Sequence, residues 1–128
     1  CWPAEGFAAL AGKLAAPILL IEGPADVEAC SRVRALMPSA VPVIEAKELS
    51  LLEAAALIEQ CKLYVGNDSG LTHLAAALGI PTVAVFGPTD PSVWAPLGRR
   101  VEAVCSKDGT AWPKLNAVLE AVGRLQNT

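Results

Sequence analysis

Residues 63–91 alternate short apolar runs with polar turns, and this pattern constrains the fold more than any other feature of the sequence. An apolar run at 63–65 leads into a glycine-flanked polar turn at 66–70, and a helical stretch follows. An apolar, β-branched run at 82–86 leads into a second polar turn at 87–91. Both turns therefore follow the carboxyl ends of predicted strands, which is the edge where parallel α/β sheets bind ligands.

The rest of the chain continues this alternation of β-rich runs with helical periodicity. We expect further strands at 18–21, 41–44 and 101–105, and helices that begin near Pro3, Asp26, Ser50 and Pro113. The continuously apolar run at 18–21 is typical of a strand that is buried on both faces. The alternation predicts the α/β class, with a three-layer, Rossmann-like parallel sheet and helices on both faces. At 128 residues, we expect one domain, 1–128.

For two of the predicted helices, the sequence also predicts the residues that cap the first turn and those that face inward. Asp26 is placed to cap one helix, and Ser50 with Glu53 matches the capping-box pattern at the start of the next. The apolar spacing predicts two inward faces, made by Val27, Cys30, Val33 and Met37 in the first of these helices and by Leu51, Ala54, Ala55 and Ile58 in the second.

Charge and composition exclude several classes of function. A net charge of −3 without a basic run argues against electrostatically driven nucleic-acid binding. The apolar runs are too short to span a bilayer, and no signal peptide is visible. The four cysteines are widely spaced without a C-x-x-C motif, so we expect free, buried thiols in a reducing cytosol. Because the chain starts at Cys1 and goes straight into a helix, we expect a fragment whose preceding strand is missing.

The first polar turn has the chemistry of an anion site. Gly66 permits a tight turn, Asp68 or Ser69 is placed at the helix N-cap, and Gly70 lets the backbone come close to a ligand. The free N–H groups of the first helical turn and the helix dipole favour a phosphate or diphosphate there. The turn lacks a Walker lysine and a G-x-G-x-x-G motif, and it is also compatible with an ordinary capped βα turn.

His73 lies one helical turn after Ser69, so both side chains can face the same side. A Ser–His nucleophile pair is conceivable, but the turn is not the G-x-S-x-G elbow of serine hydrolases. Asp68, His73 and Asp90 could be metal ligands, although nothing in their spacing demands a metal. His73 is otherwise a partly buried residue that hydrogen-bonds to a neighbouring loop, or a donor to a phosphate or to the adjacent turn.

Two further turns are expected at the same edge of the sheet. The prolines of the turn at 87–91 stiffen it, and Thr89 and Asp90 supply polar groups. This turn is either a rigid turn with local hydrogen bonds or a wall of the same pocket. The acids of the turn at 22–28 could hold ribose hydroxyls or merely cap a helix.

The residues Val65–Ala77, followed by Gly79-Ile80-Pro81 and the run Phe86–Pro91, closely resemble the carboxyl-terminal domain of glycosyltransferase family 9. This family comprises bacterial ADP-heptose:lipopolysaccharide heptosyltransferases. Trp2–Phe7 looks like the family's W-P-x-E-x-[FW] helix start, and Gly23-Pro24 with the acids that follow looks like its next βα turn. The resemblance covers nearly the whole chain.

The resemblance implies half of a GT-B fold, in which two Rossmann-like domains enclose the active site. The second domain would hold the nucleotide-sugar donor, and transfer would be inverting without a cofactor or a bound metal. The implied donor contacts are Asp68 on the sugar, the backbone of Ser69, Gly70 and Leu71 on the diphosphate, His73 in support, Leu49 beside adenine, Asp26 or Glu28 on the ribose, and Thr89 in the pocket wall. No catalytic residue is assigned within this chain.

Some parts of the family pattern differ or are absent. The family's lysine precedes the W-P motif and lies outside the chain, and Asn67-Asp68-Ser69 replaces the commoner acid-Thr pairing. The acceptor domain is also absent, so we expect no transfer by this chain alone. The expected function is donor binding in lipopolysaccharide core biosynthesis, in the cytoplasm at the inner face of the bacterial inner membrane, with peripheral membrane association. The alternatives are an epimerase-like or a non-catalytic nucleotide-binding α/β module.

Overall fold

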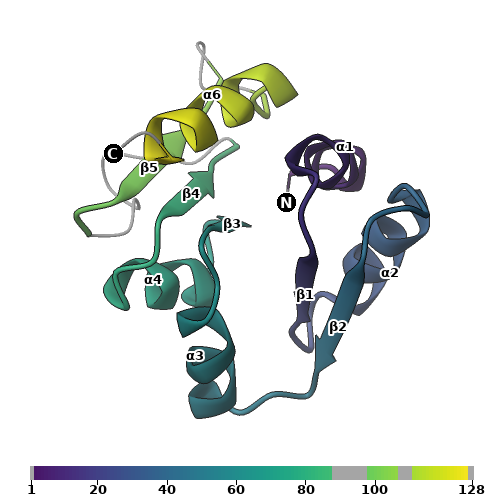
Figure 1. Ribbon diagram of the computed structural model, residues 1–128, viewed down its shortest axis with the longest axis vertical. Helices are drawn as coiled ribbons and strands as arrows, with labels where there is room; N and C mark the ends of the chain where they lie inside the picture. Colours follow the sequence, from purple (N-terminus) through teal and green to yellow (C-terminus); the bar gives the residue numbers. More distant parts are fainter. Residues whose placement is uncertain (1, 88–97, 107–110, 127–128) are drawn as a thin grey trace. The chain divides into compact units, whose positions relative to one another are not determined.

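The computed structural model describes residues 2–87, 98–106 and 111–126, and it alternates strands with helices as predicted (Figure 1). The helices are α1 (Ala4–Leu14), α2 (Val27–Leu36), α3 (Leu51–Glu59), α4 (Gly70–Ala77) and α6 (Leu115–Gln126). The strands are β1 (Ile18–Glu22), β2 (Val43–Lys47), β3 (Tyr64–Asn67), β4 (Thr82–Val85) and β5 (Val101–Val104). Each strand pair is parallel and helices flank the sheets, so the predicted α/β class is confirmed.

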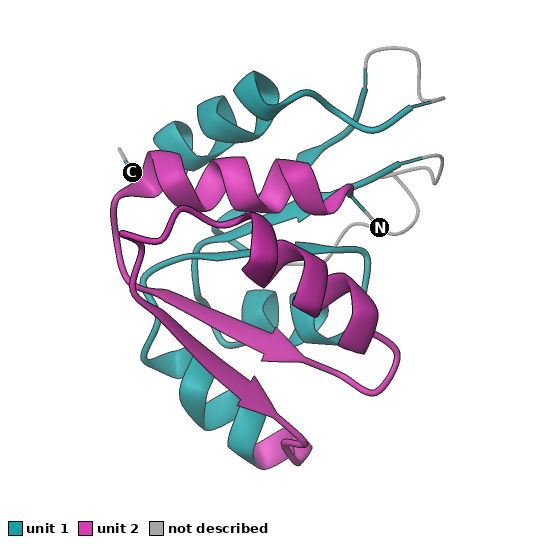
Figure 2. Ribbon diagram, turned by 90° about the vertical axis from the view of Figure 1, so that its right-hand side faces the viewer, with its two compact units in different colours: residues 1–2, 53–128 teal, residues 3–52 magenta. Residues whose placement is uncertain are grey.

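The chain divides into two compact units (Figure 2). The first unit contains residues 1–2 and 53–128, and the second contains residues 3–52. The strands form two sheets among the described residues: β3-β4-β5 in the first unit and β1-β2 in the second.

In the second unit, β1 and β2 pair in register from Ile18–Val43 to Glu22–Lys47, and α2 connects them. Helices α1 and α2 pack against each other around a small apolar core. The buried members of this core are Ala8, Ala11, Val33 and Met37. Alanine predominates on α1, which allows the two helices to pack closely.

Several details of the second unit differ from the sequence predictions. Strand β1 is half-buried along its length rather than buried on both faces, because β2 is its only hydrogen-bonded neighbour among the described strands. Strand β2 begins at Val43 rather than at 41. The N–H of Val41 bonds to the Pro38 carbonyl in a turn, and Pro42 has no N–H with which to continue the ladder.

Two predicted inward faces are wrong at their first residues. Val27 is 56% exposed although Val33 is buried, because two steps of three residues leave these side chains roughly 120° apart around the helix. Leu51 is 69% exposed, whereas Ile58 of the same helix is fully buried. Leu51 is the first residue of α3, and burial along this helix begins only at Ala54, which is 3% exposed.

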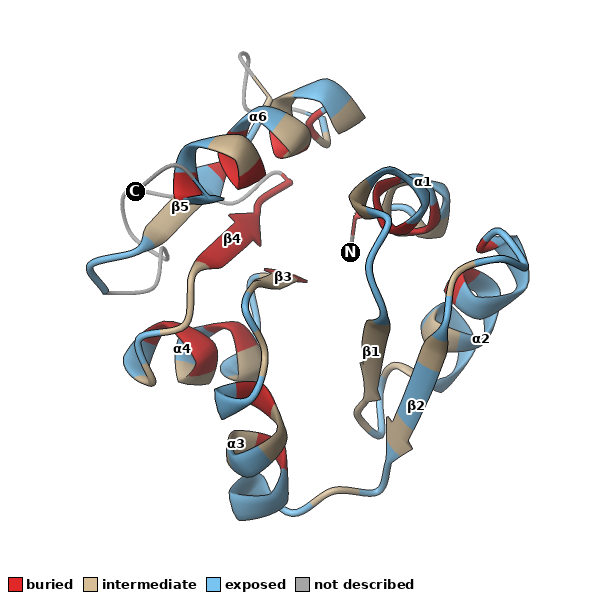
Figure 3. Ribbon diagram, in the orientation of Figure 1, coloured by how far each residue is buried: buried red, intermediate tan, exposed pale blue. Residues whose placement is uncertain are grey.

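In the first unit, β4 is the central strand of the sheet and all four of its residues are buried (Figure 3). Helix α4 contacts β3 and β4, whereas α6 contacts β4 and β5, and β4 lies between the two helices (Figure 1). The largest fully buried apolar side chains are Phe86, Ile58, Val83, Val85 and Val118. This arrangement holds the carboxyl end of β3 at a fixed position relative to the start of α4.

Trp2 also belongs to the first unit and is only 3% exposed. Its Nε1–H donates to the Pro113 carbonyl oxygen at 3.0 Å, and its backbone N–H donates to Asn67 Oδ1 at 2.8 Å. At the end of β4, a Cβ on Gly87 would lie 2.6 Å from the Trp112 ring, so a larger residue would collide with that ring. The rest of the second polar turn, including Thr89 and Asp90, lies outside the described residues.

Three cysteines lie within the described residues, and all three are free thiols. Cys30 and Cys61 are half-buried, and burial raises the pKa of both thiols. Cys105 is exposed, so the expectation of a buried thiol is wrong there, because it follows directly after the end of β5. None of the helices in the described part of the chain combines the length and the apolar character that are needed to cross a membrane.

Candidate functional site

The loop between β3 and α4 is short, because β3 ends at Asn67 and α4 begins at Gly70. Ser69 is the N-cap, with extended backbone angles of φ −151° and ψ 166°. Its Oγ accepts the Thr72 N–H at 3.4 Å, and its carbonyl oxygen accepts the His73 N–H at 3.2 Å. Of the two candidates that the sequence left open, Ser69 therefore caps the helix.

The N–H groups of Gly70 and Leu71 lie in the first turn of α4, and no described residue accepts a hydrogen bond from either of them. Gly70 is exposed, and a Cβ built on it would meet no atom within 4 Å. The α4 dipole adds positive potential at the same place. These features together give an accessible backbone surface that is suited to an anion.

Asp68 and His73 face each other across this turn. His73 Nε2 lies 3.4 Å from Asp68 Oδ1, and the two side chains are 47% and 27% exposed respectively. The side chain of His73 therefore reaches the adjacent turn, which is one of the roles predicted for it. Ser69 Oγ contacts Thr72 instead of His73, so the described residues give no support to a Ser–His nucleophile pair.

A cluster of hydroxyl groups, which sequence reasoning missed, lies beneath the turn. Thr72 is completely buried, and its Oγ1–H donates to the Asn67 carbonyl oxygen. The same Oγ1 lies 3.2 Å from Ser69 Oγ and 3.4 Å from the Tyr64 hydroxyl oxygen. A threonine three positions after the N-cap, on a helix whose only other polar side chain is His73, was the available signal.

Gly66 has a role other than the predicted one. It is a residue of β3 rather than of a tight turn, so that prediction is wrong. A Cβ on Gly66 would lie 2.7 Å from both Thr72 Oγ1 and Tyr64 Cε1. Glycine at this position therefore makes room for the hydroxyl cluster of Tyr64, Ser69 and Thr72.

The remaining predicted contacts, Asp26, Glu28 and Leu49, belong to the second unit, whereas residues 68–73 belong to the first. Asp26 precedes α2 but makes no side-chain cap bond, so the predicted cap is wrong. Its Oδ2 instead accepts the Gly23 N–H at 3.3 Å, across the turn between β1 and α2.

Glu28 and Leu49, the other two predicted contacts in the second unit, differ in exposure. Glu28 is exposed in the first turn of α2. Leu49 is half-buried and follows Glu48, whose φ of 54° is in the left-handed region that non-glycine residues rarely adopt. Ser50 separates Leu49 from the start of α3. Within the described residues, no group of three His, Cys, Asp or Glu side chains is placed to hold a metal ion.

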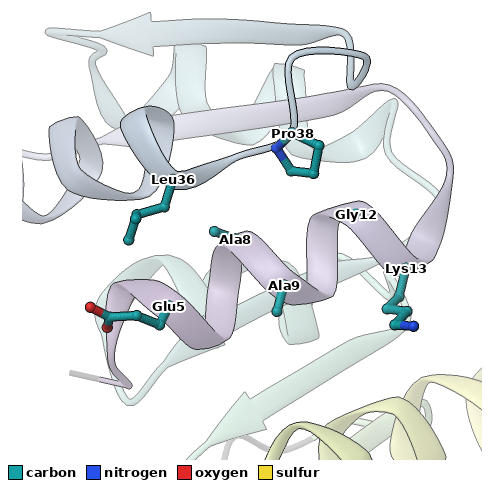
Figure 4. A pocket seen from close by; sticks show the side chains of 7 residues that line it. All are labelled: Glu5, Ala8, Ala9, Gly12, Lys13, Leu36 and Pro38. Atoms are coloured by element: carbon teal, nitrogen blue, oxygen red, sulfur yellow. The ribbon is translucent and has the colours of Figure 1, made fainter.

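Two shallow cavities lie away from the predicted contacts. One of about 490 Å³ lies in the second unit between α1 and the residues Leu36 and Pro38 (Figure 4). The other, of about 400 Å³, lies in the first unit between the end of α4 and residues 98–100. Neither cavity is lined by a residue that the sequence placed in the site.

A model of glycosyltransferase family 9 (heptosyltransferase) matches residues 1–120. The chain belongs to this family. The family 9 assignment that the motifs at 65–77 and 86–91 suggested is thus confirmed over nearly the whole chain.

Curated family 9 relatives include two enterobacterial proteins. The chain is 36% identical over 109 residues to lipopolysaccharide heptosyltransferase 2 of Salmonella typhimurium LT2. The aligned region covers 80% of the chain and 31% of the relative. The chain is also 34% identical over 130 residues to lipopolysaccharide heptosyltransferase 1 of Escherichia coli K12. This aligned region covers 97% of the chain and 40% of the relative. The chain thus spans 31% to 40% of the length of these family 9 proteins.

Solved structures of family 9 proteins have the same fold as this chain. The glycosyl transferase family 9 protein of Veillonella parvula superposes with a TM-score of 0.80 and 29% identity, over 97% of this chain and 41% of that protein. E. coli heptosyltransferase WaaC with ADP also gives a TM-score of 0.80 and 29% identity, over 97% of this chain and 39% of WaaC. A second WaaC structure contains ADP-2-deoxy-2-fluoro heptose.

Proposed function

We propose that this chain is the donor-binding domain, spanning residues 1–128, of an inverting heptosyltransferase that acts in lipopolysaccharide core biosynthesis. The observation that carries the proposal is the exposed first turn of α4, in a chain that belongs to glycosyltransferase family 9. The names of the relatives support heptose transfer, and the ADP and ADP-sugar in the WaaC structures support an ADP-linked donor.

In this proposal, the N–H groups of Gly70 and Leu71 donate to the diphosphate of the donor. The open surroundings of Gly70 and the α4 dipole support that role. The backbone of Ser69 completes the contact, while its hydroxyl remains bonded to Thr72. Asp68 contacts the sugar, and His73 holds the Asp68 carboxylate from the helix side.

The ribose and base contacts are assigned to the second unit. We favour Glu28 for the ribose hydroxyls, because the Asp26 carboxylate already accepts the Gly23 N–H. Leu49 lines the adenine pocket, and the unusual backbone of Glu48 beside it is consistent with a specially shaped loop. Thr89 remains proposed for the pocket wall.

The reaction would use an acceptor domain that is outside this chain. An oxygen of the lipopolysaccharide core acceptor bonds to the anomeric carbon of the sugar, and the bond from that carbon to the diphosphate oxygen breaks. The electron pair leaves with ADP, whose developing charge the N–H groups of α4 stabilise. A base of the acceptor domain takes the acceptor's proton. The complete enzyme would act in the cytoplasm, associated peripherally with the inner membrane.

Titration of the chain with ADP, UDP and GDP tests the proposal. At about 100 times its dissociation constant, ADP should stabilise the fold by roughly 2.7 kcal/mol, a shift of several degrees in Tm. A preference for UDP would favour the epimerase-like alternative. If none of the three nucleotides raises Tm, the result would favour a non-catalytic α/β module instead.

Gly70→Val places a side chain on the proposed diphosphate surface, and its Cβ would meet no protein atom within 4 Å. It should abolish the ADP shift while the variant stays folded. Gly123→Ala is the matched control, because Gly123 lies in α6 with equally open surroundings. Full ADP binding by Gly70→Val would count against this surface as the diphosphate site.

A further inference from the structure

We propose that the buried hydroxyl of Thr72 is a positioning group for the diphosphate-binding turn. The inference rests on the proposed function, because it assigns a role within the same site. Thr72 is fully buried in the first turn of α4, so it cannot touch the donor itself. It would act through the residues on either side of the loop.

The Thr72 hydroxyl joins the end of β3 to the N-cap of α4. Its single proton goes to the Asn67 carbonyl oxygen, because that oxygen can only accept. The Thr72 oxygen then accepts from Ser69 Oγ, 3.2 Å away. Ser69 Oγ in turn accepts the Thr72 N–H, so the Ser69 hydroxyl is held at both its proton and a lone pair.

These bonds fix the two ends of the segment that carries Asp68. The Asn67 carbonyl sets the peptide that precedes Asp68, and Ser69 sets the peptide that follows it. The N–H groups of Gly70 and Leu71 come directly after this segment. A hydroxyl at position 72 therefore orients the groups that would meet the sugar and the diphosphate.

The surrounding residues are arranged around this one hydroxyl. Gly66 leaves room for it, since any Cβ there would lie 2.7 Å from Thr72 Oγ1. The Tyr64 hydroxyl oxygen approaches the same Oγ1 at 3.4 Å from the strand side. The Thr72 hydroxyl is therefore closely packed on its strand side as well as bonded to Asn67 and near Ser69.

The test compares ADP affinity, measured by calorimetry, among single variants of the full chain. Thr72→Val keeps the shape and removes the hydroxyl, and it should raise the Kd for ADP about tenfold, the effect of one lost hydrogen bond. Thr72→Ser keeps the hydroxyl and should restore the affinity to within roughly threefold of the original chain. Rescue by serine separates positioning from packing, because serine lacks the methyl group that valine retains.

Thr82→Val is the matched control for loss of stability. Thr82 is also completely buried, and its Oγ1–H donates to the Ile80 carbonyl oxygen at 2.7 Å. It pairs with Tyr64 in the sheet, at the opposite end of β3 from Asn67. Thr82→Val should lower Tm as Thr72→Val does, while its Kd for ADP stays unchanged.

The outcomes separate the two levels of the proposal. If the original chain does not bind ADP, the proposed function fails and this inference falls with it. If it binds ADP and Thr72→Val binds equally well, only the positioning role is overturned. Should Thr72→Val not fold, Tyr64→Phe carries the test, with an expected rise in Kd of about threefold. An unaltered Kd in Tyr64→Phe would then overturn the role.

Discussion

The indole Nε1–H of Trp2 donates a buried hydrogen bond to the Pro113 carbonyl oxygen at a distance of 3.0 Å. The backbone N–H of Trp2 bonds to Asn67 Oδ1 at 2.8 Å. Trp2 thus connects the segment before α6 with the residue that precedes the candidate site. This double attachment makes a residue at the start of the described chain part of the framework of the first unit.

Trp2→Phe should destabilise the chain, because it removes the donor and leaves the buried Pro113 carbonyl without this bond. The free energy of unfolding should fall by about 1–3 kcal/mol, as measured by urea denaturation followed by circular dichroism. Lys13→Gln, at an exposed position, should change it by less than about 0.5 kcal/mol. Equal midpoints for the two variants would show that the bond contributes no net stability.

Ala15→Gly should stabilise the chain. Ala15 ends α1 in the left-handed region, with φ 51° and ψ 40°, where glycine avoids the steric cost of a Cβ. We expect a gain of about 1 kcal/mol in thermal or chemical denaturation. The neighbouring Ala16→Gly, which has no such backbone angle, should give no gain. A loss of stability in Ala15→Gly would contradict the backbone conformation.

Gly123→Ala should also stabilise the chain, through a different cause. Gly123 lies within α6, and a Cβ there would meet no atom within 4 Å. Alanine lowers the backbone entropy of the unfolded chain and favours the helix, by about 0.5–1 kcal/mol. Differential scanning calorimetry should show a higher Tm. A lower Tm would indicate that the space beside Gly123 is filled.

Alkylation by iodoacetamide should distinguish the three described thiols. Cys105 is exposed and should react first. Cys30 should react more slowly, because burial, followed by the nearby carboxylates of Asp26 and Glu22, raises the pKa of its thiol. Its rate should still rise above about pH 9.5, where a thiol with the ordinary pKa of about 8.5 is already largely ionised. Peptide mapping by mass spectrometry measures each site, and faster labelling of Cys30 than of Cys105 would contradict this order.

The alternation of strands and helices was predictable because each element carries its own periodicity or its own Gly and Pro boundary. The turn between β3 and α4 was recognised for the same reason, with its N-cap narrowed to Asp68 or Ser69. Local patterns could not show which way a side chain turns within a loop. Asp26 looked like a helix cap, yet its carboxylate bonds to Gly23, because the turn offers a competing N–H.

Long-range relationships were not predictable from local sequence. Gly66 leaves room for the side chains of Tyr64 and Thr72, and Thr72 approaches it only when β3 and α4 pack together. The bond from Trp2 to Pro113 joins positions 111 residues apart, and no local pattern indicates it. Val27 was misplaced because six residues of helix turn it roughly 120° away from Val33. Leu51 was misplaced because periodicity predicts a helix face but not how far along the helix the packing extends.

The placement of Trp2 in the first unit has a consequence for synthesis on the ribosome. Residues 3–52 form the second unit, so that unit can be complete before any strand of the β3-β4-β5 sheet has been translated. At roughly 5–20 residues per second, Pro113 emerges roughly 5–20 s after Trp2. The Trp2 indole therefore lacks its Pro113 acceptor throughout that interval, and the first unit can close around it only near the end of translation of this segment.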